Sequence, residues 1–261
     1  MYYIGIDVGS ACSKYAVIDE QNEVLYRNVI PTGWSSSSAA EAVRQDLLLR
    51  GYNPEHNPCV ATGYGRNSVE FADKAVTEIT CHCLGASHLF GDGASTVIDI
   101  GGQDTKIINI SGGIVQDFLM NDKCSAGTGR FVEIMAKILE LDPMSLCALA
   151  ESGTEVTISS MCTVFAESEV IGLIGRGVKK ADIAFGIVDS VASKVASQCG
   201  RIKRSTRYYL TGGLCECRYL MKVLGDKLGV CIVSNPEGRY AGALGAALSA
   251  KKLEKGGRTD G

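Results

Sequence analysis

Two segments of the chain repeat the same arrangement of an aspartate, a glycine-containing turn and a lysine between apolar runs. The first segment covers residues 6–18 and the second covers residues 98–110. In each, an Asp-x-Gly sequence closes the first apolar run, and a lysine follows the aspartate by seven residues before the second run begins. Two such matches in one chain indicate an internal duplication.

The chemistry expected of this arrangement is the binding of phosphate and metal. Each copy is predicted to form a β-hairpin with a tight turn, in which glycine allows a phosphate to approach the backbone N–H groups. Asp7 and Asp99 end the first strand of their hairpins, where a carboxylate can hold Mg²⁺ directly or through water. Two such hairpins facing each other would grip a triphosphate, whereas two ordinary hairpins would share no ligand. Because the pattern occurs twice, we favour nucleotide binding.

The residues expected to contact the nucleotide belong mainly to the two turns. In the first copy they are Gly9, Ser10, Ala11, Cys12 and Ser13, with Lys14 directly after them. Lys14 would add a positive charge near the phosphates, or it would be a surface lysine in an ordinary salt bridge. Cys12 is expected to be only a small residue beside the nucleotide. In the second copy the turn residues are Gly101, Gly102 and Gln103.

The apolar runs predict the elements that carry these turns. Strands are expected at residues 3–7, 15–18 and 24–29, followed by a helix at 39–50 and a strand near 60–62. The order begins again at Thr96, with strands at 106–110 and 114–118 and a helix from Gly129. Later strands are expected at 208–211 and 230–233, and an alanine-rich helix at 241–250. Mixed sheets flanked by helices place the chain in the α/β class.

The composition is that of an ordinary globular protein and argues against several functions. The chain has 261 residues, a net charge of −3 and no basic stripe, so nucleic-acid binding is not expected. No apolar run approaches the roughly 18 residues needed to cross a bilayer, and no signal peptide is recognised, which predicts a cytoplasmic protein. In a reducing cytoplasm the 11 cysteines would not form a disulfide framework.

The two hairpins resemble the first and second phosphate motifs of the actin/Hsp70/hexokinase ATPase superfamily. Residues 209–213 resemble its adenosine motif, in which Gly212 and Gly213 would let the adenosine lie against the backbone, and residues 242–247 resemble its closing helix. This resemblance implies a duplicated actin-like, ribonuclease-H-like ATPase fold of two lobes with the nucleotide in the cleft. Lobe I would comprise residues 1–95 and 240–261, and lobe II would comprise residues 96–239.

A narrower resemblance rests on four stretches spread along most of the chain. They are residues 62–67, 99–104, 120–131 and 158–171, with the sequences TGYGRN, DIGGQD, MNDKCSAGTGRF and ISSMCTVFAESEVI. They resemble the activators of 2-hydroxyacyl-CoA dehydratases and the ATPase subunits of benzoyl-CoA reductase, which are BadF/BadG/BcrA/BcrD-type ATPases. The resemblance implies a homodimer with one [4Fe–4S] cluster between its subunits, and ATP-driven transfer of an electron to a separate enzyme.

The same resemblance implies roles for further residues. It places Gln103 and Asp104 at the γ-phosphate, where Gln103 would orient the attacking water and the role of Asp104 stays open. Gly127 would also contact the nucleotide. The bound species would be ATP or ADP with Mg²⁺, the partner a 2-hydroxyacyl-CoA dehydratase or a related reductase, and the electron source a ferredoxin or a flavodoxin.

Cys124 and Cys162 are the expected ligands of the cluster. Each precedes a segment predicted to be an apolar-rich helix, and a helix N-terminus stabilises a thiolate. A [4Fe–4S] cluster takes four thiolates, so two chains would supply two each. By composition alone the two cysteines would more often be buried core residues, and it is the resemblance that reverses this preference.

The other cysteines and the histidines carry weaker expectations. Cys81-x-Cys83 and Cys215-x-Cys217 could bind metal, although one-residue spacing is a weak signature and alternate cysteines on a strand or turn are the plainer interpretation. Cysteines in apolar surroundings, expected in the core, are Cys59, Cys147, Cys199 and Cys231. The histidines, expected to be exposed or satisfied because they are too scattered for a catalytic site, are His56, His82 and His88.

Two alternatives share the predicted fold but not the chemistry. A small-molecule, sugar-type kinase could use Asp104 as its catalytic base, and the cysteine-containing stretches would then have no explanation. A non-redox, actin-like module would bind ATP without any cluster. Because a fold does not determine a function, the site itself must distinguish these possibilities.

Overall fold

The two repeated segments form hairpins in two different sheets. The computed structural model describes residues 1–159 and 162–256, and the chain divides into two units. Unit 1 comprises residues 1–93, 110–115 and the segment from Glu237 onward, and unit 2 comprises residues 94–109 and 116–236. Residues 257–261, the predicted end of lobe I, lie outside the described residues.

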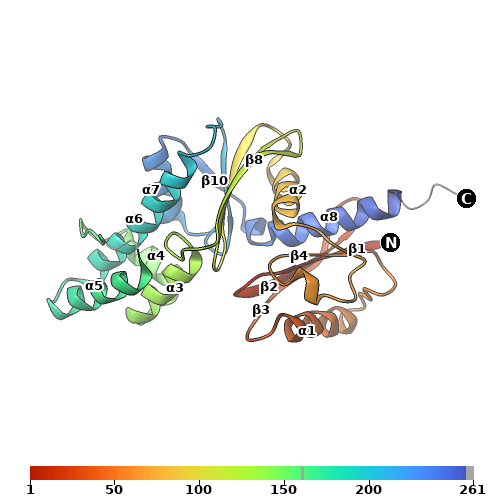
Figure 1. Cartoon of the computed structure of the whole chain (residues 1–261), viewed down its shortest axis with the longest axis horizontal. Helices are drawn as coiled ribbons and strands as arrows, with labels where there is room; N and C mark the ends of the chain where they lie inside the picture. The colour runs from red at the N-terminus through yellow and green to blue at the C-terminus, as the bar shows by residue number, and fades with distance from the viewer. Residues whose placement is uncertain (160–161, 257–261) are drawn as a thin grey trace, which may run out of the picture. The chain divides into compact units, whose positions relative to one another are not determined.

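Unit 1 is built on a five-stranded mixed sheet in the order β3-β2-β1-β4-β5 (Figure 1). The strands are β1 (Tyr2–Val8), β2 (Cys12–Asp19), β3 (Val24–Pro31), β4 (Cys59–Thr62) and β5 (Lys74–Ala75). Strands β1, β2 and β3 pair in antiparallel fashion, and β4 pairs in parallel with β1 and β5. The helices are α1 (Ser36–Leu49), α2 (Glu78–Phe90) and α8 (Ala241–Gly256), with short 3₁₀ helices at Arg66–Ser68 and Pro236–Tyr240.

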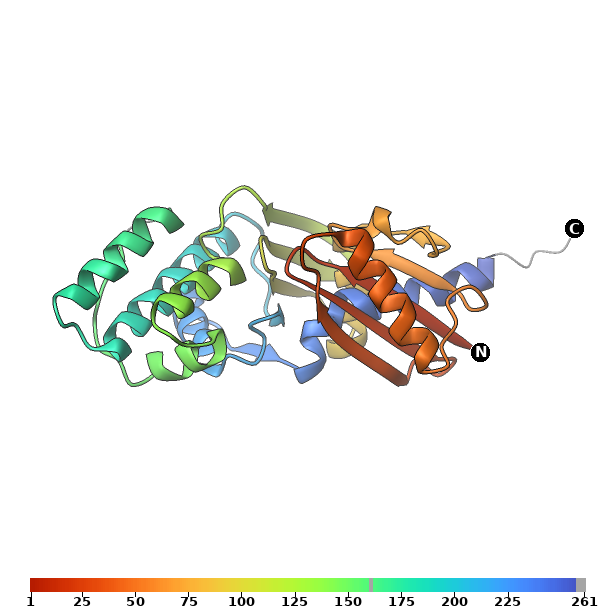
Figure 2. The same cartoon turned by 90° about the horizontal axis from the view of Figure 1, so that it is seen from below.

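Both faces of the unit 1 sheet are buried. Alternation along β1 directs Ile6 toward α1, where Leu47 is fully buried beside it, and directs Tyr3 toward α8. Figure 2 shows α1 and α8 on opposite sides of these strands. A Cβ at Gly5 would lie 2.0 Å from the Ala243 carbonyl oxygen, so glycine at this position lets α8 approach β1 closely.

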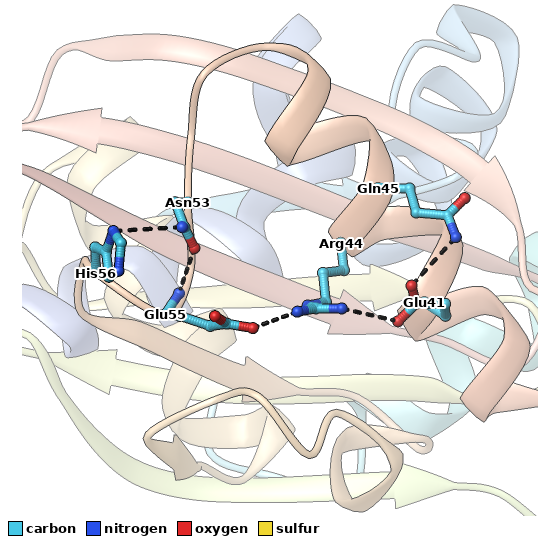
Figure 3. A network of polar contacts seen from close by, with 6 residues as sticks. All are labelled: Glu41, Arg44, Gln45, Asn53, Glu55 and His56. Carbon is cyan, nitrogen blue, oxygen red and sulfur yellow. Dashed lines mark hydrogen bonds and ion pairs between the residues drawn. The ribbon is translucent and has the colours of Figure 1, made fainter.

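Polar contacts attach α1 to the segment that follows it (Figure 3). Arg44 of α1 forms an ion pair with Glu41, 3.7 Å away, and another with Glu55. Glu55 donates its N–H to the side chain of Asn53, which also contacts His56 over 3.3 Å. Exposed ion pairs contribute little to stability, so we interpret this network as a surface attachment rather than a site.

Unit 2 contains a second five-stranded sheet in the order β10-β9-β6-β7-β8 and five helices. The strands are β6 (Ser95–Ile100), β7 (Thr105–Ser111), β8 (Ile114–Asn121), β9 (Tyr208–Gly212) and β10 (Ile232–Ser234). The helices are α3 (Gly129–Ile138), α4 (Pro143–Ala150), α5 (Thr163–Gly175), α6 (Lys180–Cys199) and α7 (Arg218–Leu228). Strand β9 pairs in parallel with β6 and β10, and the helices share one apolar core with the sheet. Among the described residues, no helix is long and apolar enough to cross a membrane.

The predicted order of strands and helices is confirmed, while several ends differ. Helix α1 begins at Ser36 rather than Ala39, because Ser35 caps it by accepting the Ser38 N–H over 3.3 Å. Helix α8 continues past the predicted end to Gly256. The strand predicted at residues 230–233 begins only at Ile232.

The expectation that Cys231 lies in the core was wrong, since its side chain is exposed. Cys231 directly precedes β10, which forms the edge of the unit 2 sheet. An edge strand has a neighbour on one side only, and Val233 within β10 is likewise exposed. At Cys231, apolar neighbours in the sequence therefore do not imply a buried side chain.

Candidate functional site

The turn between β1 and β2 is held by bonds to its carbonyl groups. Thr32 donates its hydroxyl to the Gly9 carbonyl over 2.7 Å and its N–H to the Ala11 carbonyl over 3.0 Å. A Cβ at position 9 would lie 2.8 Å from the Cys12 carbonyl oxygen, which explains the glycine there. In the described part of the chain, no acceptor is bonded to the N–H of Ser10 or Ala11. These N–H groups are therefore available to an anion.

Asp7, which precedes the last residue of β1, lies in a cradle formed by two glycines. The residue is 5% exposed. One carboxylate oxygen lies 2.5 Å from the position of a Cβ built at Gly63, and the other lies 2.5 Å from the corresponding position at Gly242. Within residues 1–159 and 162–256, no donor or cationic side chain is bonded to this carboxylate. A buried carboxylate without a protein partner is unfavourable unless a cation or water compensates it, so the cradle fits Mg²⁺.

Helix α2 brings a histidine to the same place. Nε2 of His82 lies 3.1 Å from the Cβ position at Gly242, which Asp7 approaches from its own side. His82 was expected to be exposed or satisfied, and because it is buried only the second alternative applies. Its position was not predictable because the sequence pattern did not indicate α2 as a helix.

The two cysteines flanking His82 are packing residues of α2. Burial raises the pKa of Cys81 to about 12, and burial also raises the pKa of Cys83, whose thiol contacts the Gly113 carbonyl over 3.4 Å. Residues two apart on a helix do not face each other, so these thiols point to different neighbours. They lie on a helix, and not on the strand or turn that the sequence suggested.

The second Cys-x-Cys pair is also explained by packing. Cys215 and Cys217 are buried in the unit 2 core, and Cys217 caps α7 by accepting the Leu220 N–H over 3.4 Å. Burial and a hydrogen bond with Cys217 raise the pKa of Cys147, which lies in the same core. Among the described residues, no group of three or more His, Cys, Asp or Glu side chains could hold a metal ion. Neither Cys-x-Cys pair is therefore supported as a metal site.

The turn between β6 and β7 is held by charged side chains. Asp99 is 2% exposed and accepts a 2.9 Å hydrogen bond from the Thr211 hydroxyl. Nζ of Lys106, a residue that is 3% exposed, lies 3.6 Å from Asp99 and 2.7 Å from Asp104. The second carboxylate oxygen of Asp104 folds against Gly101, 2.3 Å from the Cβ position there. A buried lysine therefore compensates the charge of Asp99 in the second copy. Among the described residues, Asp7, its counterpart in β1, is bonded to no such cation.

Open positions surround this second turn. Gln103 is exposed, and no described residue is bonded to its side chain. Gly212 adopts a φ of +89°, and a Cβ there would lie 2.3 Å from the Ile100 carbonyl oxygen, to which the Gly213 N–H is bonded over 3.2 Å. A Cβ at Gly213 would meet no atom within 4 Å, so the backbone is accessible beside this position. The end of β9 therefore offers a free backbone surface for a flat ligand.

Cys124 and Cys162 lie in neighbouring loops of unit 2, and both are exposed. Cys124 lies between β8 and α3, and Cys162 is the N-cap residue of α5. The hydroxyl groups of Ser125 and Thr163, the residues that follow the two cysteines, are 2.6 Å apart. Residues 160–161, which belong to the stretch before Cys162, lie outside the described residues. The structure thus brings the two predicted ligands into one region with accessible thiols.

The N-terminus of α3 is bonded to the turn between β6 and β7. The Gly129 N–H donates to the Gly101 carbonyl over 2.8 Å, and the Arg130 N–H donates to the Gly102 carbonyl over 2.7 Å. These amides are therefore not available to a group at Cys124. The expectation that a helix N-terminus stabilises both thiolates is corrected for Cys124. No side chain caps α5, so its N-terminal amides remain oriented toward Cys162.

Gly127, which was expected at the nucleotide, lies between this turn and Cys124. It adopts a φ of +83°, and its carbonyl accepts the buried Thr105 hydroxyl over 2.7 Å. A Cβ at Gly127 would also lie 2.8 Å from the Lys194 side chain. Glycine is required here by conformation and by space.

Several residues that the sequence analysis did not select complete these arrangements. They are Thr32, His82, Thr105, Lys106 and Thr211. Lys106 repeats the Asp–Lys spacing of the first copy, Thr105 lies in the same repeat, and Thr211 lies in the stretch that resembles an adenosine motif. Thr32 and His82 contact the site through tertiary structure, and a single sequence gives no sign of such contacts.

Comparison with known proteins gives consistent matches along the chain. The model of the BadF/BadG/BcrA/BcrD ATPase family matches residues 4–250. The (R)-2-hydroxyglutaryl-CoA dehydratase activating ATPase of Acidaminococcus fermentans is 44% identical over 255 residues, which cover 97% of this chain and 98% of that protein.

Two solved structures are similar along nearly their whole lengths. Component A of the Acidaminococcus fermentans (R)-2-hydroxyglutaryl-CoA dehydratase matches with a TM-score of 0.90 and 43% identity, covering 97% of this chain and 99% of that one. The activator of the 2-hydroxyisocaproyl-CoA dehydratase from Clostridium difficile, solved with bound ADPNP, matches with a TM-score of 0.88 and 36% identity, covering 100% of both chains. These matches confirm the predicted α/β class and the actin-like ATPase fold.

Proposed function

Because the chain belongs to the BadF/BadG/BcrA/BcrD ATPase family, we propose that it hydrolyses ATP to donate single electrons to a 2-hydroxyacyl-CoA dehydratase. Relatives matched along their whole length are named as activators of such dehydratases. The observation that carries the proposal is the pair of exposed cysteines, Cys124 and Cys162, in two loops that Ser125 and Thr163 join. Those loops adjoin a phosphate-binding turn, as a nucleotide-controlled redox centre requires.

Each turn of the duplication, taken by itself, offers groups that suit a part of the nucleotide. The free N–H groups of Ser10 and Ala11 suit a phosphate, and the Asp7 cradle suits Mg²⁺ or its water ligands. Lys106 compensates the charge of Asp99. Asp99 could therefore lie near the phosphates of the nucleotide without repelling them. The adenosine would lie on the open backbone at Gly213.

Hydrolysis would depend on Gln103 more than on Asp104. The side-chain amide of Gln103 is exposed and offers both a donor and an acceptor to the attacking water. Asp104 is less suited to take a proton, because Lys106 binds one of its oxygens and the other folds against Gly101. This arrangement also weakens the kinase alternative, in which Asp104 would be the base.

A [4Fe–4S] cluster shared by two identical subunits would supply one-electron chemistry, with Cys124 and Cys162 of each subunit as its four ligands. The thiols of this chain fit that role because they are exposed and lie in adjacent loops. The open N-terminus of α5 would stabilise the thiolate of Cys162 and the negative charge beside it.

The electron source would be a ferredoxin or a flavodoxin, and the acceptor a separate dehydratase or a related reductase. We place this activity in the cytoplasm, where thiols remain reduced. Nucleotide binding can drive the transfer only if ATP favours one arrangement of the cysteine loops over another. The loops must therefore respond to the phosphate-binding turn.

The proposal is tested by iron content and colour. Protein purified without oxygen is expected to be a brown dimer with four irons per two chains, since each chain supplies two of the four thiolates. Cys124→Ser and Cys162→Ser should each abolish the visible absorption and most of the iron, while ADPNP binding persists. Cys231→Ser is the matched control, because it removes another exposed thiol and should leave both unchanged.

Three results would contradict the proposal. Full iron content in both cysteine variants would move the centre to other ligands. A colourless protein that phosphorylates a sugar would support the kinase, and a colourless protein that binds ATP without acting on sugars would support the non-redox module.

A further inference from the structure

The loop that follows Cys124 is bonded to the phosphate-binding turn at one end. The hydroxyl of Thr105, a fully buried residue, donates to the Gly127 carbonyl over 2.7 Å. The first amides of α3 bind the carbonyl groups of Gly101 and Gly102. A displacement of the turn must therefore move the loop or break these bonds.

The same loop is rigid as far as the residue next to Cys124. Thr128 donates both its N–H and its hydroxyl to the Ser125 carbonyl, over 3.0 and 2.7 Å. The Asn121 side chain donates to the Cys124 carbonyl over 2.8 Å. The backbone on both sides of Cys124 is thus fixed relative to Gly127.

A side-chain hydrogen bond then joins this loop to the second cysteine. The Ser125 and Thr163 hydroxyl groups are 2.6 Å apart, and Thr163 directly follows Cys162 at the start of α5. Ser159, which precedes residues 160–161, is attached to α5, because it binds the Glu169 carboxylate through its N–H and its hydroxyl. Cys162 is the N-cap residue of α5 and therefore moves with this helix, and the Ser125–Thr163 bond connects α5 to the loop of Cys124.

We propose that Thr105, Ser125 and Thr163 are positioning residues that transmit the state of the phosphate-binding turn to the two cysteines in sequence. Thr105 acts first and affects both thiols, whereas the Ser125–Thr163 bond acts second and affects Cys162. This inference rests on the proposed function, because it assumes that a nucleotide binds at the turn. None of the three side chains need touch the nucleotide or the metal.

The order of the links predicts a graded pattern of loss. Without the Thr105 hydroxyl, the buried Gly127 carbonyl loses a partner and the loop is no longer held to the turn by this bond. Without the Ser125 or the Thr163 hydroxyl, the response should reach Cys124 and fail to reach Cys162. A merely structural role would destabilise the protein without separating the two cysteines.

The test measures thiol reactivity in the full chain without its cluster, under reducing, oxygen-free conditions. Iodoacetamide alkylation of each cysteine is followed by peptide mass spectrometry, with and without Mg-ADPNP. In the wild type, the analogue should change the rates at Cys124 and Cys162 by about fivefold, the factor that one ordinary hydrogen bond represents. The rate at Cys231, which is exposed and outside these loops, should stay constant.

The variants separate the two links. Ser125→Ala and Thr163→Val should keep the fivefold change at Cys124 and reduce the change at Cys162 to near onefold. Thr105→Val should reduce both changes, and Thr105→Ser should restore them because it keeps the hydroxyl. Ser168→Ala is the control on α5, since among the described residues its hydroxyl is bonded only to the Val164 carbonyl of the same helix.

Calorimetric titration with Mg-ADPNP distinguishes the possible failures. If the wild type binds no nucleotide, the proposed function fails and this inference fails with it. If nucleotide binds but Cys162 responds equally in the wild type, Ser125→Ala and Thr163→Val, the inference is overturned while the proposed function stands. An unresponsive wild type with intact nucleotide binding would also overturn it.

Discussion

Two lysines at equivalent positions of the duplication have different roles. Lys106 is 3% exposed and lies within ion-pair distance of Asp99 and Asp104. Lys14 is partly exposed, and among the described residues it forms no ion pair. A buried lysine keeps its charge only beside carboxylates, so Lys106 is part of the structure of its turn, whereas Lys14 remains available to a ligand.

Lys106→Met should therefore destabilise the protein strongly, with or without nucleotide. The change keeps the length of the side chain but removes the cation that lies within ion-pair distance of Asp99 and Asp104, and the loss of one partner of a buried ion pair costs about 3–5 kcal/mol. Lys14→Met, its counterpart in the first copy, should change the free energy of unfolding by less than about 1 kcal/mol. Urea unfolding followed by circular dichroism measures both; equal effects of the two variants would contradict this interpretation.

At single residues, what a sequence reveals depends on where the partner lies in the chain. The positions of Asp7 and Asp99 near the ends of their strands were predictable because strand, carboxylate and glycine turn are contiguous, while their roles stay predictions. Thr32 was not, because it reaches the turn at Gly9 from the end of another strand. His82 was not, because its position beside Asp7 depends on how α2 and α8 pack.

Among the helices and strands, α1 shows how one half-buried carboxylate attaches a helix to a sheet. Asp46 of α1 accepts hydrogen bonds from Tyr15 of β2 over 2.6 Å and from Tyr26 of β3 over 2.7 Å. Partial burial acts to raise the pKa of Asp46, but the hydrogen bonds from Tyr15, Tyr26 and Asn28 outweigh it and lower the pKa. Burial and the hydrogen bond to Asp46 raise the pKa of Tyr15. The ionised carboxylate therefore attaches α1 to the sheet.

This attachment should be sensitive to acid. A carboxylate with a lowered pKa stabilises the folded state above its ordinary pKa of about 4, and the contribution disappears as the pH falls through the folded-state pKa. Tyr15→Phe should lower the free energy of unfolding by about 1–3 kcal/mol at neutral pH. The difference from the wild type should shrink below about pH 4.

A second tyrosine on the same unit provides the control. The Tyr2 hydroxyl binds the Gly51 carbonyl and the Asn53 N–H, neither of which titrates. Tyr2→Phe should therefore have the same effect at all acidic pH values tested by urea unfolding. The contrary result is that Tyr15→Phe lowers the free energy of unfolding by the same amount down to pH 2.5, about 1.5 units below the ordinary pKa of an aspartate. That result would show that the ionised Asp46 is not the partner through which Tyr15 stabilises the protein.

Elements with a clear pattern of apolar residues and a local signal at their ends were predictable. Strands β1 and β2, helix α1 and helix α8 belong to this group. Helix α2 was missed because Cys81, Cys83, Gly85 and Ala86 are all buried, so its sequence lacks the alternation of a one-sided helix. Cys231 was placed wrongly because the position of β10 at the sheet edge is a property of the whole sheet.

For the whole molecule, the duplication explains the two sheets and not the features that distinguish the units. Helices α4, α5 and α6 lie between α3 and β9 in unit 2 and include the residue pair Cys162–Thr163 at the start of α5. Residues 110–115 group with unit 1 because Gly112 donates to the Asp92 carbonyl and the Cys83 thiol contacts Gly113. Residues 110–115 lie within the predicted lobe II, residues 96–239, because the contacts that group them with unit 1 join parts of the chain distant in sequence.

The proposed assembly predicts that the dimer depends on iron. Each chain supplies only two of the proposed thiolate ligands, so a four-thiolate cluster cannot form within one chain and must join two. Chelation of iron without oxygen should therefore convert the dimer to monomers, measured by light scattering, while calorimetry shows that Mg-ADPNP still binds. Cys162→Ser should be monomeric from the start, and Cys231→Ser should behave as the wild type. A dimer that persists after complete iron removal would mean that protein surfaces hold the subunits together, and a monomer that retains its iron would require all ligands to come from one chain.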